Sequence, residues 1–94
     1  MIREAEIEAA LCEGVIALGG EVRKVKWQGR RGAPDRAVFW PCGVVHWIEL
    51  KSDTGRVSPS QAIEHAKLRK LGQQIYVLRG LYAVRAYLAC ALPT

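Results

Sequence analysis

Residues 35–51 constrain the fold most, because they contain two strand-like segments separated by one tight turn. Residues 36–40 and 44–51 are the two arms, and the turn between them contains Pro41, Cys42 and Gly43. This spacing predicts an antiparallel hairpin. We expect its arms to be the central strands of the sheet.

Three segments have the pattern of helices. Apolar residues recur at helical spacing across residues 2–18, and Gly19-Gly20 ends that pattern as a C-terminal cap would. The pair Ser58-Pro59 supplies an N-cap residue followed by proline at the first helical position, which predicts a second helix ending near Leu71. The apolar stretch of residues 81–92 predicts a third.

Two further segments have the pattern of strands. Residues 22–27 alternate apolar and polar side chains, and residues 74–78 are rich in β-branched and aromatic types. The predicted order of elements is therefore αβββαβα. No internal repeat or linker interrupts it, so residues 1–94 should form one α/β domain, with a mixed central sheet flanked by helices.

Composition excludes several classes of protein. No apolar stretch approaches the ~20 residues of a membrane span, and acidic residues lie at the start, where a secretory signal would be basic and then apolar. The three cysteines are odd in number and far apart, which argues against a disulfide framework or a zinc site. We expect a cytoplasmic protein with no membrane partner.

The positive charge of the chain points to an anionic partner. The formal net charge is +5, and counterion release makes nucleic-acid binding strong wherever basic side chains meet phosphates. Such contacts position a duplex without reading its bases, so we expect a preference for DNA shape, such as branches or flaps. Some of these residues will only solubilise the surface. The candidate phosphate-binding residues are Lys24, Lys26, Arg30, Arg31, Arg36 and Arg56.

A cluster of acidic and basic residues carries the predicted chemistry. Strand alternation places Glu49 and Lys51 on one face, and Asp35 begins the neighbouring strand, where it lies beside Glu49. Two carboxylates form an oxygen ligand set that suits Mg²⁺ or Mn²⁺, and an adjacent lysine orients or deprotonates an attacking water. The alternative interpretation is a salt bridge at the end of a strand.

These residues match a known signature. Pro34-Asp35 followed by Glu49-Leu50-Lys51 resembles the PD-(D/E)xK nuclease motif, and the predicted order of elements resembles the restriction-endonuclease-like core of that superfamily. The runs GRRGAPDR, WIELK and GRVSPSQ, with His65, are similar to the virus-type replication-repair nuclease (VRR-NUC) domain. The resemblance covers nearly the whole chain. It also implies a viral or mobile-element origin, which would place the protein in the host cytoplasm.

The resemblance implies roles for individual residues. Asp35 and Glu49 would bind the metal together with the backbone carbonyl of Leu50, and Lys51 would assist the nucleophilic water. Gln61 corresponds to a glutamine on the second helix. From spacing alone, Gln61 and His65 share a helix face, so both could aim at the sheet or at a phosphate. The alternative is that Gln61 is an exposed residue at the start of the helix and His65 a packed or solvated one.

The family also places a catalytic glutamate on the first helix. Relative to the centre of the apolar stripe, Glu4 lies roughly 40° away and Glu8 roughly 80° away. That geometry favours Glu4, whereas the spacing to the glycines favours Glu8 as a metal ligand, by analogy with resolvases of this fold. Both residues remain candidates.

Chain length and the third helix bear on oligomeric state. A domain of 94 residues buries only roughly 60 to 65% of its unfolded surface, so self-association would cover further apolar area. Residues 81–92 carry a single charge, at Arg85. Either this helix lies in a homodimer interface, or it is covered within its own domain.

The sequence thus predicts a metal-dependent, structure-selective DNA endonuclease, and a dimer with two sites would suit resolution of Holliday junctions. A flap nuclease or exonuclease in DNA repair is the first alternative. A nucleic-acid-binding module with a degenerate nuclease fold is the second, and the presence of Asp35, Glu49 and Lys51 argues against it. A structural protein whose acids and bases merely pair is the third.

Overall fold

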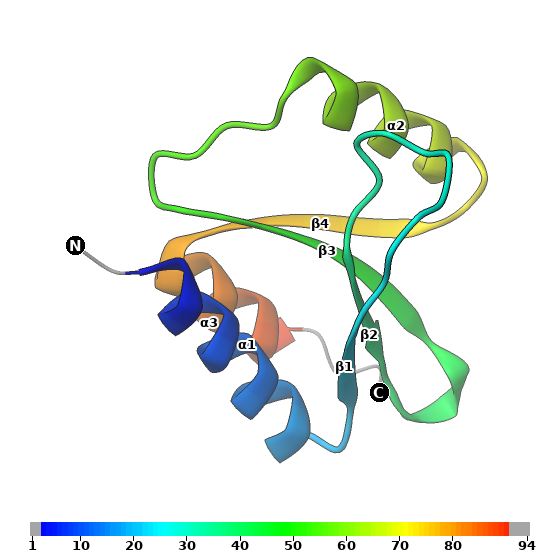
Figure 1. Cartoon of the computed structure of the whole chain (residues 1–94). Coiled ribbons are helices and arrows are strands. Elements are labelled where there is room, and N and C mark those ends of the chain that lie inside the picture. Colours follow the sequence, from blue (N-terminus) through cyan, green and yellow to red (C-terminus); the bar gives the residue numbers. More distant parts are fainter. Residues whose placement is uncertain (1–2, 91–94) are drawn as a thin grey trace.

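A computed structural model describes residues 3–90 and contains one four-stranded sheet with helices on both faces (Figure 1). The order of elements is the predicted αβββαβα, with a short 3₁₀ turn added in the hairpin. The elements are α1 (Glu4–Ala17), β1 (Glu21–Lys24), β2 (Arg36–Phe39), η1 (Pro41–Gly43), β3 (Val45–Lys51), α2 (Pro59–Lys70), β4 (Gln74–Arg79) and α3 (Gly80–Cys90).

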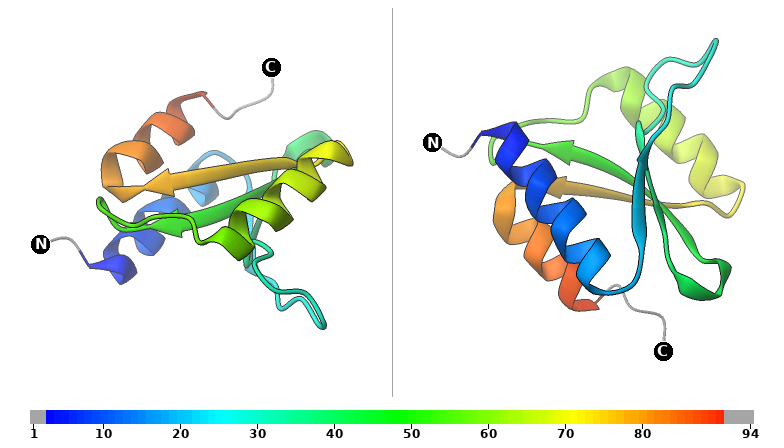
Figure 2. Two further views of the ribbon diagram at one scale, coloured as in Figure 1. Left: turned by 90° about the horizontal axis from the view of Figure 1, so that it is seen from above. Right: turned by 60° about the horizontal axis from the view of Figure 1, so that its bottom comes forward.

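The sheet is mixed, with strand order β1-β2-β3-β4. β1, β2 and β3 are antiparallel neighbours, whereas β4 runs parallel to β3 because α2 connects them as a crossover. The views in Figures 1 and 2 place α1 and α3 together on one face of the sheet and α2 on the other. The hairpin of residues 35–51 supplies the two central strands, as predicted.

The hydrophobic core lies between the sheet and the helices α1 and α3. Period-two alternation in β3 directs Ile48 and Leu50 toward this core, and therefore directs Glu49 and Lys51 toward the face covered by α2. The core thus fixes the orientation of the predicted site. Its buried members are Ile7, Leu11, Val15, Val38, Trp40, Ile48, Leu50, Leu78, Val84 and Tyr87.

Two predicted boundaries change in the structure. β1 ends at Lys24 rather than at Trp27, because after Lys24 only the Val25 amide still pairs with the neighbouring segment, at the Asp35 carbonyl. The side chain of Trp27 folds back and donates from its indole to the carbonyl of Pro34. Residues Pro41–Gly43 form a 3₁₀ turn in which Cys42 has a φ of 70°. The predicted hairpin is retained around that turn.

One side of the third helix is covered within its own chain. Val84 is fully buried and Tyr87 nearly so, and Leu88 packs against the Gly14 position of α1. Residues 91 and 92 of the predicted helix lie outside the described residues. Contacts with the sheet and with α1 therefore explain the buried apolar residues of α3, as the second alternative predicts, whereas Tyr82 on its outer side is exposed.

No helix among residues 3–90 has the length and apolar character needed to cross a membrane.

Candidate active site

Strand pairing brings the two predicted carboxylates together. Arg36 of β2 pairs with Ile48 of β3, and continuing this antiparallel register by one residue places Asp35 opposite Glu49. The negative charge of Asp35 contributes to a raised pKa at Glu49, although burial is the larger cause. The two side chains therefore lie within electrostatic reach of each other.

Glu49 is a buried carboxylate beside a lysine. Only 8% of the residue is exposed, and its Oε2 atom lies 3.9 Å from Nζ of Lys51. Burial raises the pKa of Glu49, while the Lys51 ammonium lowers it. A carboxylate in such a position is unfavourable unless a cation compensates it, and one lysine at this distance compensates only in part.

α2 contributes a buried histidine to the same face. His65 is 1% exposed, and its Nε2 atom lies 3.6 Å from Oε1 of Glu49. Among the described residues, this nitrogen is the one buried side-chain nitrogen or oxygen without a hydrogen-bond partner. Burial lowers the pKa of His65, and the positive charges of Arg69 and Lys51 lower it further. Burial therefore favours the neutral form of His65, whose Nε2 atom faces the carboxylate.

The position of Arg36 differs from the exposed, phosphate-binding position that the sequence predicts. The guanidinium was expected to contact DNA phosphates, but Arg36 is buried, and it donates from Nε to Glu8 Oε2 at 2.7 Å and from Nη1 to Asp35 Oδ1 at 2.9 Å. Strand alternation is the reason: Arg36 shares the face of Ile48, which α1 covers, and Glu8 lies on α1. Arg36 thus organises acidic side chains.

The two helix-one glutamates have different surroundings. Glu8 accepts from Arg36, which is the main cause of its lowered pKa, and Lys24 lies 3.8 Å away. Glu4 is exposed, and its charge is one of those that raise the pKa of Glu49. In this arrangement Glu4 acts electrostatically on the site, whereas Glu8 is held by Arg36 on the opposite face of the sheet.

Gln61 occupies a capping position. Its Oε1 accepts from the Ser58 amide at 2.9 Å, and its own amide donates to Ser58 Oγ at 3.2 Å, which together form a capping box. The spacing of Ser58 and Gln61 would have allowed this to be predicted from sequence. The geometry therefore gives Gln61 a structural role at the start of α2, beside any catalytic one.

The loop between β1 and β2 is anchored at several points. The Trp27 indole donates to the Pro34 carbonyl at 2.7 Å, and the Val25 amide donates to the Asp35 carbonyl at 2.8 Å. Farther out, Arg30 pairs with the buried Glu64 of α2 at 3.8 Å. These bonds fix the backbone that carries Asp35. Sequence reasoning missed the anchoring role of Trp27, because it depends on how the loop folds back.

The remaining candidate phosphate-binding side chains are on the outside of the protein. Lys24, Lys26, Arg30, Arg31 and Arg56 are all exposed. Four of them belong to β1 or to the β1–β2 loop, and this loop projects past the sheet alongside α2 (Figure 2). They are thus accessible to a large anionic ligand.

The carboxylates of Asp35 and Glu49 fit a magnesium site in which water and substrate supply the other ligands. Among residues 3–90, no three Asp, Glu, His or Cys side chains gather closely enough to enclose a metal. Mg²⁺ is usually held by one or two carboxylates, with waters and phosphate oxygens filling the other positions. Asp35 and the incompletely compensated Glu49 fit that pattern. β3 also continues through Glu49, Leu50 and Lys51 beyond its pairing with β2, so this strand end is not covered by β2.

Comparison with solved structures identifies the family. A structure described as "VRR_NUC domain" superimposes on this chain with a TM-score of 0.87 and 33% sequence identity, covering 95% of this chain and 97% of the other. The chain belongs to the VRR-NUC family. It is therefore a nuclease domain of that type, and both the predicted family and the predicted fold class are confirmed.

Two further relatives agree with this assignment. "Putative nuclease p44" of Acyrthosiphon pisum secondary endosymbiont phage 1 is 42% identical over 78 residues, which are 83% of this chain and 84% of that protein. A second structure, "VRR_NUC domain protein", has a TM-score of 0.71 and 15% identity over 94% of this chain and 86% of the other, which shows the shared fold alone. No family model matches the sequence.

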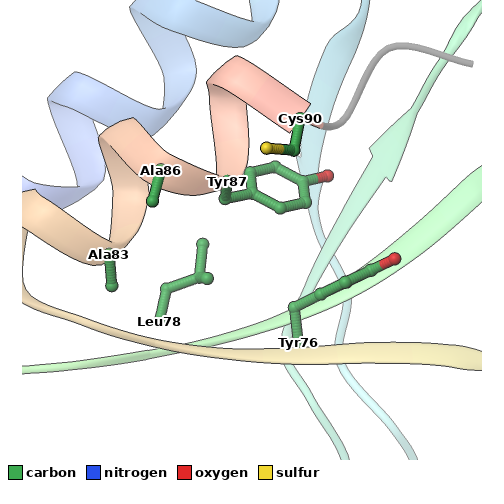
Figure 3. A pocket seen from close by; sticks show the side chains of 6 residues that line it. All are labelled: Tyr76, Leu78, Ala83, Ala86, Tyr87 and Cys90. Carbon is green, nitrogen blue, oxygen red and sulfur yellow. The ribbon is translucent and has the colours of Figure 1, made fainter.

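A separate apolar groove of about 420 Å³ lies away from the carboxylates of this VRR-NUC domain (Figure 3). Tyr76 and Leu78 of β4 line it, and they pair in register with Ile48 and Leu50, on the sheet face opposite Glu49. The other lining residues come from α3. The groove is therefore separate from the candidate catalytic residues.

Proposed function

We propose that this VRR-NUC domain is a Mg²⁺-dependent endonuclease that hydrolyses phosphodiester bonds in DNA, with Mn²⁺ able to replace Mg²⁺. The observation that carries the proposal is the position of Glu49: it is buried, opposite Asp35 and 3.9 Å from Lys51. Burial of a carboxylate beside a second one is unfavourable by itself, and a divalent cation with its phosphate ligand would compensate both.

Each residue has a distinct role in this proposal. Asp35 and Glu49, with the carbonyl of Leu50, would hold the metal, which supplies positive charge to the phosphate and lowers the pKa of a bound water. Lys51 Nζ faces the Oε2 atom of Glu49, where it orients the attacking water and stabilises negative charge on the phosphate. Arg36 holds the Asp35 carboxylate through Oδ1 and keeps Glu8 paired.

Exposed basic residues would bind the DNA backbone. Lys26, Arg31 and Arg56 form no ion pair among residues 3–90 and would contact phosphates, and Lys24 and Arg30 would do so beside their pairs with Glu8 and Glu64. Arg36 is left out of this set because it is buried against Glu8 and Asp35. Phosphate contacts of this kind favour DNA shape over sequence, which supports a branched substrate.

We further propose a homodimer that resolves four-way junctions, in which two sites cut two strands. Val84 lies in the core, so the interface would use the outer side of α3, where Tyr82 is 85% exposed, and the adjoining apolar groove. A flap nuclease or exonuclease in repair is the alternative activity. A single gel assay with four-way junction, flap and linear duplex in Mg²⁺ distinguishes these functions.

The test of the metal site uses Asp35→Asn and Glu49→Gln. Each variant removes a ligand charge with little change of volume, so Mg²⁺-dependent cleavage should be lost while the fold is retained. Lys51→Ala should reduce the cleavage rate without a comparable loss of metal binding, because the lysine acts on water and phosphate. Calorimetric Mg²⁺ binding that is unchanged in both carboxylate variants would contradict the metal-ligand assignment, and wild-type turnover in Lys51→Ala would remove Lys51 from the site.

A further inference from the structure

The two oxygens of Glu49 have different neighbours. Oε2 faces Nζ of Lys51 at 3.9 Å, whereas Oε1 faces Nε2 of His65 at 3.6 Å. Each carboxylate oxygen of Glu49 therefore has a side-chain nitrogen beside it, at a distance longer than a hydrogen bond. The lysine lies on the same strand, and the histidine reaches across from α2.

The Nε2 atom of His65 has no hydrogen-bond partner among the described residues. The residue is 1% exposed, and no protein acceptor bonds to this nitrogen among the described residues. A buried polar atom without a partner destabilises a fold by roughly 1 to 3 kcal/mol, so its placement calls for an explanation. The nearest carboxylate oxygen is only slightly beyond the range of a hydrogen bond, which ends at about 3.2 Å for N–H···O.

We propose that His65 is a positioning residue, which donates a hydrogen bond from Nε2 to Oε1 of Glu49 and so fixes the orientation of this metal ligand when the site is loaded. The inference rests on the proposed function, in which Glu49 binds the metal. Hydrogen bonds in catalytic sites are often long in the free enzyme and shorten in the working complex. Partners of this kind, one step away from the metal, orient the ligands and tune the affinity.

Two substitutions separate this role from simple packing. His65→Leu introduces an apolar side chain of similar volume and removes the donor, whereas His65→Gln retains an N–H group at a similar reach. Titration with Mn²⁺ as the probe should show affinity weakened by about 10- to 100-fold in His65→Leu, with most of that loss recovered in His65→Gln. Thermal unfolding in chelator tests whether both variants fold like the wild type.

The outcomes distinguish this inference from the proposed function. Wild-type Mn²⁺ affinity in His65→Leu would overturn the role of His65 and leave the metal site intact. A wild-type protein that binds no Mn²⁺ would overturn the metal site, and the inference with it.

A second measurement uses the unmodified protein and so does not depend on a variant that folds. The chain has two histidines, and His46 lies on the opposite face of the sheet, bonded through Nδ1 to the Tyr87 hydroxyl at 2.7 Å. Nitrogen-15 spectra of the imidazole rings should show His65 protonated at Nε2 and responsive to Mg²⁺, with the His46 signals unchanged. A bare Nε2 on His65 in the presence of Mg²⁺ would overturn the inference.

Discussion

Replacement of Gly32 by alanine should detach the β1–β2 loop from α2. Gly32 has a φ of +82°, and a Cβ atom added there would lie 2.5 Å from the Ser60 carbonyl oxygen and 2.8 Å from the Gln61 amide nitrogen. Both atoms are backbone in the first turn of a helix, so they cannot move aside cheaply. Gly29 has a φ of +72° with nothing within 4 Å of the added atom, which makes Gly29→Ala the matched control.

The two variants should differ in the free energy of unfolding. The left-handed conformation alone destabilises an alanine by about 1 to 2 kcal/mol, and this applies to both positions. Overpacking adds about 1 to 3 kcal/mol, and this applies to Gly32→Ala alone. For a domain of this size, each kcal/mol corresponds to about 4 to 8 °C in Tm.

Urea denaturation of the two variants and the wild type measures this difference. Gly32→Ala should also lose nuclease activity under conditions where it remains folded, because Asp35 lies three residues farther along the same loop. Gly29→Ala should keep that activity. Equal losses of stability in the two variants would refute the argument that the loop is docked on α2, and full cleavage by Gly32→Ala would refute its link to Asp35.

Three further predictions follow from the site and its surroundings. The double substitution Arg30→Ala and Arg31→Ala should weaken binding to all DNA similarly and lower the salt slope by roughly two, and an altered base preference at an unchanged slope would indicate direct readout instead. Val84→Glu should unfold the domain because it places a charge in the core, whereas Tyr82→Glu should leave the domain folded. In light scattering, Tyr82→Glu should shift a dimer toward monomer. A Tyr82→Glu protein that stays dimeric would exclude this side of α3 from the dimer interface. In metal-free protein the raised pKa of Glu49 means that its contribution to stability is fully present below the ordinary pKa of 4.5 and is lost as pH rises through the folded-state pKa. Above that pH window, Glu49→Gln should therefore have a larger free energy of unfolding than the wild type, and below it the two should be equal. Chemical denaturation at a series of pH values measures this difference.

Local sequence spacing does not predict the pairing of Arg36 with Glu8. In sequence, Arg36 is one of several basic residues beside a glycine-containing loop, and its neighbours Arg30 and Arg31 are indeed exposed. Its burial depends on the Ile48 face of the sheet being covered by α1, and its partner Glu8 is 28 positions away. No local pattern encodes which helix covers a given face, so a phosphate-binding residue was predicted where the fold has a part-buried ion pair.

The sequence left the role of α3 open for the same reason. The helix is almost free of charge, and sequence alone cannot distinguish burial inside one chain from burial between two. Packing of Val84 and Tyr87 on the sheet accounts for that composition within the monomer. The exposed side of the helix is consequently the place where a dimer interface remains a proposal.

The sequence by itself determined the elements and the two central carboxylates, because the signals for both are local. Helical spacing, the Ser58-Pro59 start and strand alternation act over a few residues, and alternation alone places Glu49 and Lys51 on one face. Tertiary structure alone decided which side chains surround those carboxylates. His65 meets Glu49, and Arg36 meets Glu8, only because α2 and α1 cover opposite faces of the sheet, and that choice depends on the packing of the whole core.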